Sequence, residues 1–178
     1  MKRFNLFHKV LELIVILGNI VVGMTLLTYI FQGVSVDKLY LGSIVIASAL
    51  IQVCDYFTLK FTIRRRSLQK LIAAMIFAVV GVLFIFLNIE MDVVCVLLGA
   101  FTIAFSFVNL TSSSANLARK PLFNSAKIII QILNIVFSIF LIVRMESFIY
   151  TYITYLGIAM LAEALILIIE FIIHCYQN

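Results

Sequence analysis

Six long apolar runs constrain this 178-residue chain more than any other feature. A helix needs about 20 residues to cross the hydrocarbon core of a bilayer. The runs are bounded by charged or turn residues and cover about 10–31, 39–59, 70–88, 91–111, 126–144 and 148–173. The sequence therefore predicts an all-α, polytopic integral membrane protein with six transmembrane helices. The short connections leave no room for a separate catalytic or nucleic-acid-binding domain.

Composition and charge agree with this interpretation. The chain is 65% hydrophobic and 12% charged, whereas soluble domains are about 45–50% apolar and about 25% charged. A net charge of +5 would suggest a nucleic-acid partner in a soluble protein. Here the basic residues gather before the first run, between the second and third, and between the fourth and fifth. By the positive-inside rule, both termini are expected in the cytoplasm, and no nucleic-acid partner is expected.

A small-residue motif recurs at a spacing of 57 or 58 residues. The second, fourth and sixth runs each carry Leu-Gly, then Ala after four residues, and then another small residue. The glycines of these motifs are Gly42, Gly99 and Gly157. The first, third and fifth runs carry matching small residues at Gly23, Gly81 and Ser138. This recurrence indicates that one two-helix unit occurs three times.

The repeats predict one domain, residues 1–178, built from three hairpins at about 9–61, 67–118 and 125–176. Because each unit crosses the membrane twice, all three enter in the same orientation and are parallel repeats. We expect a six-helix bundle with pseudo-threefold character. Small residues allow close backbone approach in lipid. Glycines are also common in membrane helices, but their threefold recurrence favours helix packing for Gly23, Gly42, Gly81, Gly99 and Gly157.

Polar residues form stripes that we expect to face the bundle interior. In the second helix of each hairpin, positions six, ten and thirteen after the repeat glycine share one side. The first helices carry a matching stripe before their repeat residue. The members proposed to form an intramembrane polar cluster are Asn19, Gln52, Asn109, Gln131, Asn134 and Glu163.

Glu163 is the most informative of these residues because it lies near the middle of the last run. An isolated carboxylate at that depth costs several kcal/mol. One interpretation is a structural glutamate hydrogen-bonded to Asn19, Gln131 or Asn134. The other is a titrating group that supports proton binding. Because no second acidic residue appears at the same depth, the structural interpretation is favoured.

The remaining charges are expected at the cytoplasmic boundary. Glu12, Asp55 and Glu170 are placed to meet lysines or water there. The basic segment is predicted to contact anionic lipid headgroups, with an acidic protein partner as the alternative. Its residues are Arg64, Arg65, Arg66 and Lys70. The serine-rich stretch 111–116 and Pro121 are predicted to form the loop between the second and third hairpins.

No pattern of catalytic, cofactor-binding or metal-binding residues supports an enzyme. Three cysteines lack metal-site spacing, as do the two histidines. These are Cys54, Cys95, Cys175, His8 and His174. Gly-rich phosphate loops and nucleophile motifs are also absent from the sequence. We therefore expect a non-enzymatic protein without a cofactor.

The three short Leu-Gly hairpins and the basic cytoplasmic segments resemble the HdeD-like acid-resistance membrane protein family. The likeness covers about residues 9–173 and is best at Val80-Gly81 and Leu98-Gly99-Ala100-Phe101. As a divergent member, the chain would be a bacterial inner-membrane protein associated with survival in acid. The resemblance supplies no molecular activity and no catalytic residues.

Three functions remain open from the sequence. The favoured one is a non-enzymatic stress-resistance or membrane-integrity protein. The alternative is a small transporter or the substrate-binding membrane subunit of a multi-component importer. The third is an assembly partner whose small-residue faces contact a second copy of the chain or a larger membrane complex.

Overall fold

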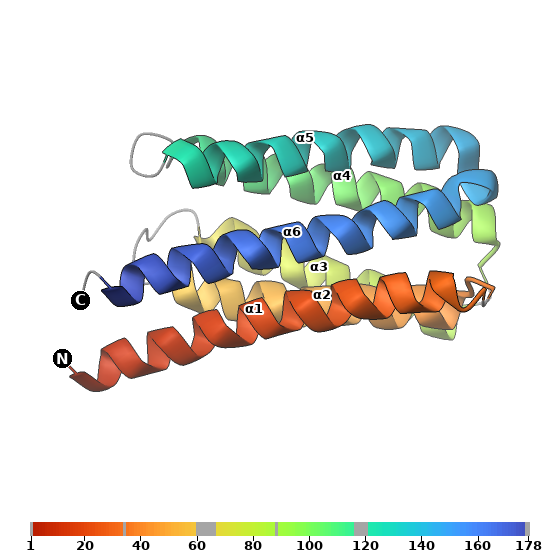
Figure 1. Ribbon diagram of the computed structural model, residues 1–178. Coiled ribbons are helices and arrows are strands. Elements are labelled where there is room, and N and C mark those ends of the chain that lie inside the picture. The colour runs from red at the N-terminus through yellow and green to blue at the C-terminus, as the bar shows by residue number, and fades with distance from the viewer. Residues whose placement is uncertain (1, 34, 60–66, 88, 116–120, 177–178) are drawn as a thin grey trace.

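Six long helices lie side by side along a common axis in the computed structural model (Figure 1). The structure describes residues 2–33, 35–59, 67–87, 89–115 and 121–176. A single 3-10 turn, η1 (Met145–Phe148), joins the last two helices. The helices are α1 (Lys2–Phe31), α2 (Lys38–Leu59), α3 (Ser67–Phe86), α4 (Met91–Ala115), α5 (Pro121–Arg144) and α6 (Ile149–Tyr176). The expected all-α fold is therefore confirmed.

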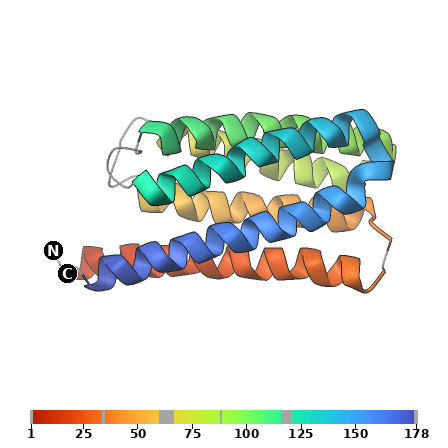
Figure 2. The ribbon, with the colours of Figure 1, turned by 45° about the horizontal axis from the view of Figure 1, so that its top comes forward.

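Successive helices run in opposite directions, so the connections alternate between the two ends of the bundle (Figures 1 and 2). The start of α1 and the end of α6 lie together at one end, called here the terminal end. Residues 32, 33 and 35–37, between α1 and α2, lie together with η1 at the other, called here the far end. At the far end, the Asp37 carboxylate accepts a hydrogen bond from the Tyr40 backbone N–H at 2.8 Å and caps the start of α2.

Five of the helices are long and apolar enough to cross a membrane. Their candidate spans are Lys9–Phe31, Lys38–Phe57, Met91–Ser114, Pro121–Arg144 and Ile149–Ile173. The apolar part of α3 is shorter, Lys70–Phe86, although α3 lies within the same bundle. Large apolar side chains such as Leu17, Phe107 and Leu165 are 51–61% exposed. An apolar outer surface of this kind suits lipid and not water, and the chain is a multi-pass helical membrane protein.

The loop predicted between the second and third hairpins is shorter in the structure. α4 continues to Ala115, and within it the Thr111 and Ser114 hydroxyls donate hydrogen bonds to the carbonyls of Val108 and Leu110, at 2.8 and 2.6 Å. Serine and threonine in a helix can satisfy their hydroxyl groups in this way without ending it. Pro121 is the first residue of α5. Proline is well tolerated there, because the first turn of a helix needs no N–H donor. Assigning 111–115 and Pro121 to a loop was therefore wrong.

The repeat glycines lie where helices approach most closely. A Cβ atom added to Gly42 of α2 would lie 2.8 Å from the Gly81 carbonyl oxygen of α3, and one added to Gly81 would lie 2.9 Å from the Gly42 oxygen. Between α4 and α5, a Cβ on Gly99 would lie 2.9 Å from the Ser138 oxygen. Contacts this short leave no room for a side chain at the glycine positions.

The third crossing joins the two ends of the chain. A Cβ atom on Gly23 of α1 would lie 3.0 Å from the Gly157 oxygen of α6, and one on Gly157 would lie 3.1 Å from the Gly23 oxygen. The three most extensive helix pairs are thus α2–α3, α4–α5 and α1–α6. Contacts between α3 and α4, and between α5 and α6, are sparser.

The apolar core occupies the half of the bundle near the far end. Leu26 and Phe84 lie late in α1 and α3, and Val94 and Tyr152 lie early in α4 and α6; all four are at most 1% exposed. Since odd-numbered helices run toward the far end and even-numbered ones return from it, these positions coincide. The other half of the bundle holds polar side chains.

Replacing Gly42 by valine should weaken the α2–α3 crossing. The new Cβ would meet the Gly81 carbonyl, which cannot move without separating the helices. Overpacking of this kind costs about 1–3 kcal/mol, so the thermal unfolding midpoint should fall. Far-UV circular dichroism of the protein in mild detergent measures it. Ala100→Leu, at an exposed position of α4, is the control. Equal unfolding midpoints for the two variants would contradict a close α2–α3 crossing at Gly42.

Candidate functional site

A cavity of about 260 Å³ lies inside the bundle and is lined by residues from all six helices. It extends from Leu26 and Tyr152, in the apolar core, toward Ser113 and Lys127 near the terminal end. Its volume is slightly below the range of about 300–1,000 Å³ usual for ligand pockets. The cavity is therefore of a size for a small molecule, not for a lipid or a peptide.

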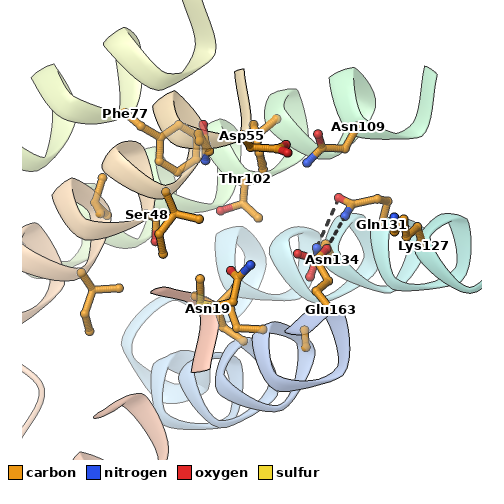
Figure 3. Close-up of a pocket in the computed structure, with 18 of the residues that line it drawn as sticks. Asn19, Ser48, Asp55, Phe77, Thr102, Asn109, Lys127, Gln131, Asn134 and Glu163 are labelled. Atoms are coloured by element: carbon orange, nitrogen blue, oxygen red, sulfur yellow. Dashed lines mark hydrogen bonds between the residues drawn. The ribbon is translucent and has the colours of Figure 1, made fainter. Parts of the chain in front are cut away.

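The structure brings the whole expected polar cluster to this cavity. The members of this cluster come from α1, α2, α4, α5 and α6, and all but Gln52 are labelled in Figure 3. They are Asn19, Gln52, Asn109, Gln131, Asn134 and Glu163. Asn19, Gln52, Gln131 and Asn134 are each at most 9% exposed. Side chains from hairpins distant in sequence thus share one polar space.

Glu163 ends a chain of hydrogen bonds between α5 and α6. Gln131 Nε2 donates to Glu163 Oε1 at 2.7 Å, and Asn134 Nδ2 donates to Gln131 Oε1 at 3.4 Å (Figure 3). The Tyr155 hydroxyl donates to Asn134 Oδ1 at 3.0 Å. Of the three partners proposed for Glu163 from the sequence, Gln131 is the one in direct contact. This series of hydrogen bonds fixes the position of the Glu163 carboxyl group at the cavity wall.

Two ion pairs lie at the terminal end of the cavity. Lys70 of α3 pairs with Asp55 of α2, and Lys127 of α5 pairs with Glu170 of α6 at 2.6 Å. The side chains are 13–32% exposed. The expectation that Asp55 and Glu170 would meet lysines is confirmed. Lys70 lines the cavity beside Asp55, which is a different place from the lipid headgroup contact proposed for it.

The opposite end of the cavity is closed by the apolar core. Leu41, Leu98 and Ile153 line it there and are 1–5% exposed. The Tyr152 hydroxyl, fully buried, donates to Thr102 Oγ1 at 2.8 Å, and Thr102 donates to the Leu98 carbonyl. This polar pair is internally satisfied, so the closed end offers little to a ligand.

Gln52 Oε1, Ser106 Oγ and Ser138 Oγ are buried polar atoms without a hydrogen-bond partner among the described residues, and of these three only Gln52 Oε1 belongs to a residue that lines the cavity. The Gln52 side chain is 9% exposed. A buried acceptor without a partner costs about 1–3 kcal/mol. Such groups are usually satisfied by water or by a ligand. Gln52 therefore marks the cavity as a place for a polar occupant.

Asn124, which lines the cavity, and Tyr155, which supports its wall, were not singled out from the sequence. Asn124 is 7% exposed and lines the cavity, and Tyr155 extends the hydrogen-bond chain. Helical spacing was the available signal. Asn124 precedes Gln131 by two turns, and Tyr155 precedes Glu163 by about two turns, so each pair shares a helix face.

Other candidate groups lie away from this site. Arg64, Arg65 and Arg66 fall outside the described residues. Within the described part of the chain, no group of three or more His, Cys, Asp or Glu residues is placed to hold a metal ion. Cys95 is buried in the apolar core, Cys54 is partly buried and Cys175 is exposed. The cavity is therefore the site with the most polar groups in one place.

The fold and the cavity together define the class: a multi-pass helical membrane protein with a polar internal cavity. No protein-family model, curated protein or solved structure matches the chain. Its function therefore has to be argued from the geometry of this site.

Replacing Gln131 by leucine should destabilise the bundle. The change keeps the side-chain size but removes the donor to Glu163 and the acceptor for Asn134. Loss of buried hydrogen bonds of this kind costs about 1–2 kcal/mol, and the unfolding midpoint in detergent should fall. Ser125→Ala, on the exposed side of the same helix, is the control. A Gln131→Leu protein as stable as this control would show that these hydrogen bonds contribute nothing to the stability of the bundle.

Proposed function

We propose that this protein binds a small polar solute in its central cavity, as a small transporter or as the substrate-binding membrane subunit of a multi-component importer. This is the alternative that the sequence ranked second. The carrying observation is Gln52, a buried amide with an unpartnered oxygen on the cavity wall. A protein with a purely structural interior would place apolar side chains there, because unsatisfied polar groups are costly in lipid.

The position of the cavity supports this proposal. It reaches toward the terminal end, where partly exposed Asp55 and Lys127 lie, and it is closed at the far end by buried residues. Transporters hold their substrate near the middle of the bilayer and expose it to one side at a time. The helices lining the cavity are continuous. Alternating exposure would therefore come from rocking of helix pairs, or from a partner subunit.

The architecture that we propose is a ring of three parallel hairpin repeats. The support is the order of the close crossings: α2 with α3, α4 with α5, and α6 with α1. Each joins the second helix of one hairpin to the first helix of the next, and the last crossing closes the ring. With the basic segments taken as cytoplasmic, the cavity would open to the cytoplasm of a bacterial inner membrane.

A second candidate is the stress-resistance role implied by the HdeD-like resemblance. Glu163 favours it, because a carboxyl group held inside the bundle by Gln131 can gain or lose a proton. This role would be non-enzymatic, with anionic lipid and a second copy or membrane complex as partners. Deletion of the gene separates the two candidates: loss of survival at low pH without a change in solute uptake would favour this role.

Filling the cavity should abolish solute binding. Ser48 lines the cavity from α2, and Ser48→Phe places a ring in the available volume. We expect a library of small polar metabolites to raise the unfolding midpoint of the wild-type protein in detergent, and Ser48→Phe to remove that shift. Ser43→Phe, at an exposed position of α2, should retain it. If no metabolite stabilises the wild type, or if both variants respond alike, solute binding in this cavity is refuted.

Cysteine accessibility tests the repeat architecture. Ser35→Cys and Glu90→Cys place one thiol in the α1–α2 connection and one at the α3–α4 connection, with the three native cysteines replaced by alanine. Parallel hairpins put both on the outer face, so a membrane-impermeant maleimide should label both in intact cells. A cysteine kept only at position 175 should react after permeabilisation. Labelling of positions 35 and 90 from opposite faces would overturn the repeats.

A further inference from the structure

The three hairpins present different side chains at equivalent levels of the cavity. The positions are four residues before the repeat residue in the first helix and six after the repeat glycine in the second. They hold Asn19 and Ser48 in the first hairpin, Phe77 and Phe105 in the second, and Asn134 and Glu163 in the third. All six line the cavity. The first hairpin thus gives the cavity an amide–hydroxyl wall and the third an amide–carboxyl wall. The second gives it the aromatic wall, Phe77 and Phe105.

The aromatic wall is held in place by ring contacts between α3 and α4. Phe77 is 8% exposed, and its ring meets that of Phe105 edge to face, with centroids 5.4 Å apart. A second edge contact, with Phe101 at 6.4 Å, supports Phe77 from the other side. Aromatic faces attract cations through the ring quadrupole. In Figure 3, Phe77 and Glu163 lie on opposite sides of the view.

Among the described residues that line the cavity, Glu163 is a carboxyl group that forms no ion pair with a lysine or arginine. Lys70 is paired with Asp55, and Lys127 with Glu170. Glu163 has the Gln131 amide as its hydrogen-bond donor, and no Lys or Arg of the described chain pairs with it. Within a membrane bundle, a carboxyl group in that position is either protonated or neutralised by a cation. The Glu163 carboxyl group therefore favours a positively charged ligand in the cavity and disfavours an anion.

We propose that the solute is a small organic ammonium ion, bound with its nitrogen between the Glu163 carboxylate and the aromatic wall formed by Phe77 and Phe105. The inference rests on the proposed solute-binding function and names its substrate class. Amide groups from Asn19 and Gln52 take the polar remainder of the ligand, and Gln52 Oε1 accepts its hydrogen bond. A neutral sugar would use the amides but would leave the carboxyl group and the aromatic wall without a function.

The test is direct binding to the full-length protein in lipid nanodiscs, followed by calorimetry. The cationic probes are choline and ethanolamine. Choline is compared with 3,3-dimethylbutan-1-ol and ethanolamine with ethylene glycol, which are neutral molecules of the same shape. Glucose serves as an uncharged polar probe. We expect at least one cation to bind tenfold or more tightly than its neutral counterpart. This comparison needs no variant, so it holds even if a substitution impairs folding.

Two matched pairs of variants locate the binding site. Glu163→Gln should weaken binding of the cation at least tenfold, and Glu90→Gln, at an exposed glutamate near the far end, should not change it. Phe105→Leu should weaken binding about threefold or more, in keeping with the usual strength of a cation–π contact. Phe107→Leu, with the original ring 53% exposed on the same helix, should leave binding unchanged.

The outcomes separate this inference from the function on which it rests. Binding of glucose or of a neutral counterpart as tight as that of the cations, lost in Ser48→Phe, would overturn the ammonium proposal and keep the solute-binding function. Failure of both cations to bind would also overturn the ammonium proposal. Failure of the whole metabolite library as well would overturn both. Cation binding that survives in Glu163→Gln and Phe105→Leu would place it outside the cavity and refute the inference.

Discussion

Close backbone contact between small residues is the constraint on which the bundle depends. Helices in lipid gain little from burying apolar surface, so they associate through van der Waals packing and hydrogen bonds. At three crossings, glycine lies against the backbone of the neighbouring helix, and an added Cβ would come within about 3 Å of a carbonyl oxygen. The crossings fix which helices are neighbours. They therefore also fix which polar stripes face each other.

The interior of the bundle is apolar near the far end and polar near the terminal end. The far half packs Leu26, Phe84 and Tyr152 to near-zero exposure, as a conventional core would. In the terminal half, amide side chains line the cavity instead, and a hydrogen bond from Gln131 holds Glu163 at its wall. Buried polar groups in a membrane need partners, and this half of the protein satisfies some of them and leaves Gln52 Oε1 unsatisfied. That unsatisfied acceptor is the observation that supports the binding function proposed above.

Periodicity in the sequence was enough to predict the helices, the close-packed glycines and the membership of the polar cluster. It worked because both the helix repeat and the spacing of 57 or 58 residues place side chains on defined faces. It did not reveal that the close crossings join α2 with α3, α4 with α5 and α1 with α6, since sequence spacing contains no information on partner choice. Pro121 and Ser114 were misassigned because composition suggested a loop. The Ser114 hydroxyl is instead satisfied by the Leu110 carbonyl inside α4, and the first turn of α5 tolerates proline. Tyr155 was missed because tyrosine is counted with the hydrophobic residues in the composition, although its hydroxyl can form hydrogen bonds.

The crossing between α1 and α6 has a consequence for biosynthesis. Gly23 of α1 meets Gly157 of α6, so α1 can make this crossing only after the five helices that follow it have entered the membrane. The cavity is lined by residues of all six helices. Until α6 is inserted, the enclosure around Asn19 is therefore incomplete, and a chain interrupted before α6 would carry a polar stripe that nothing encloses.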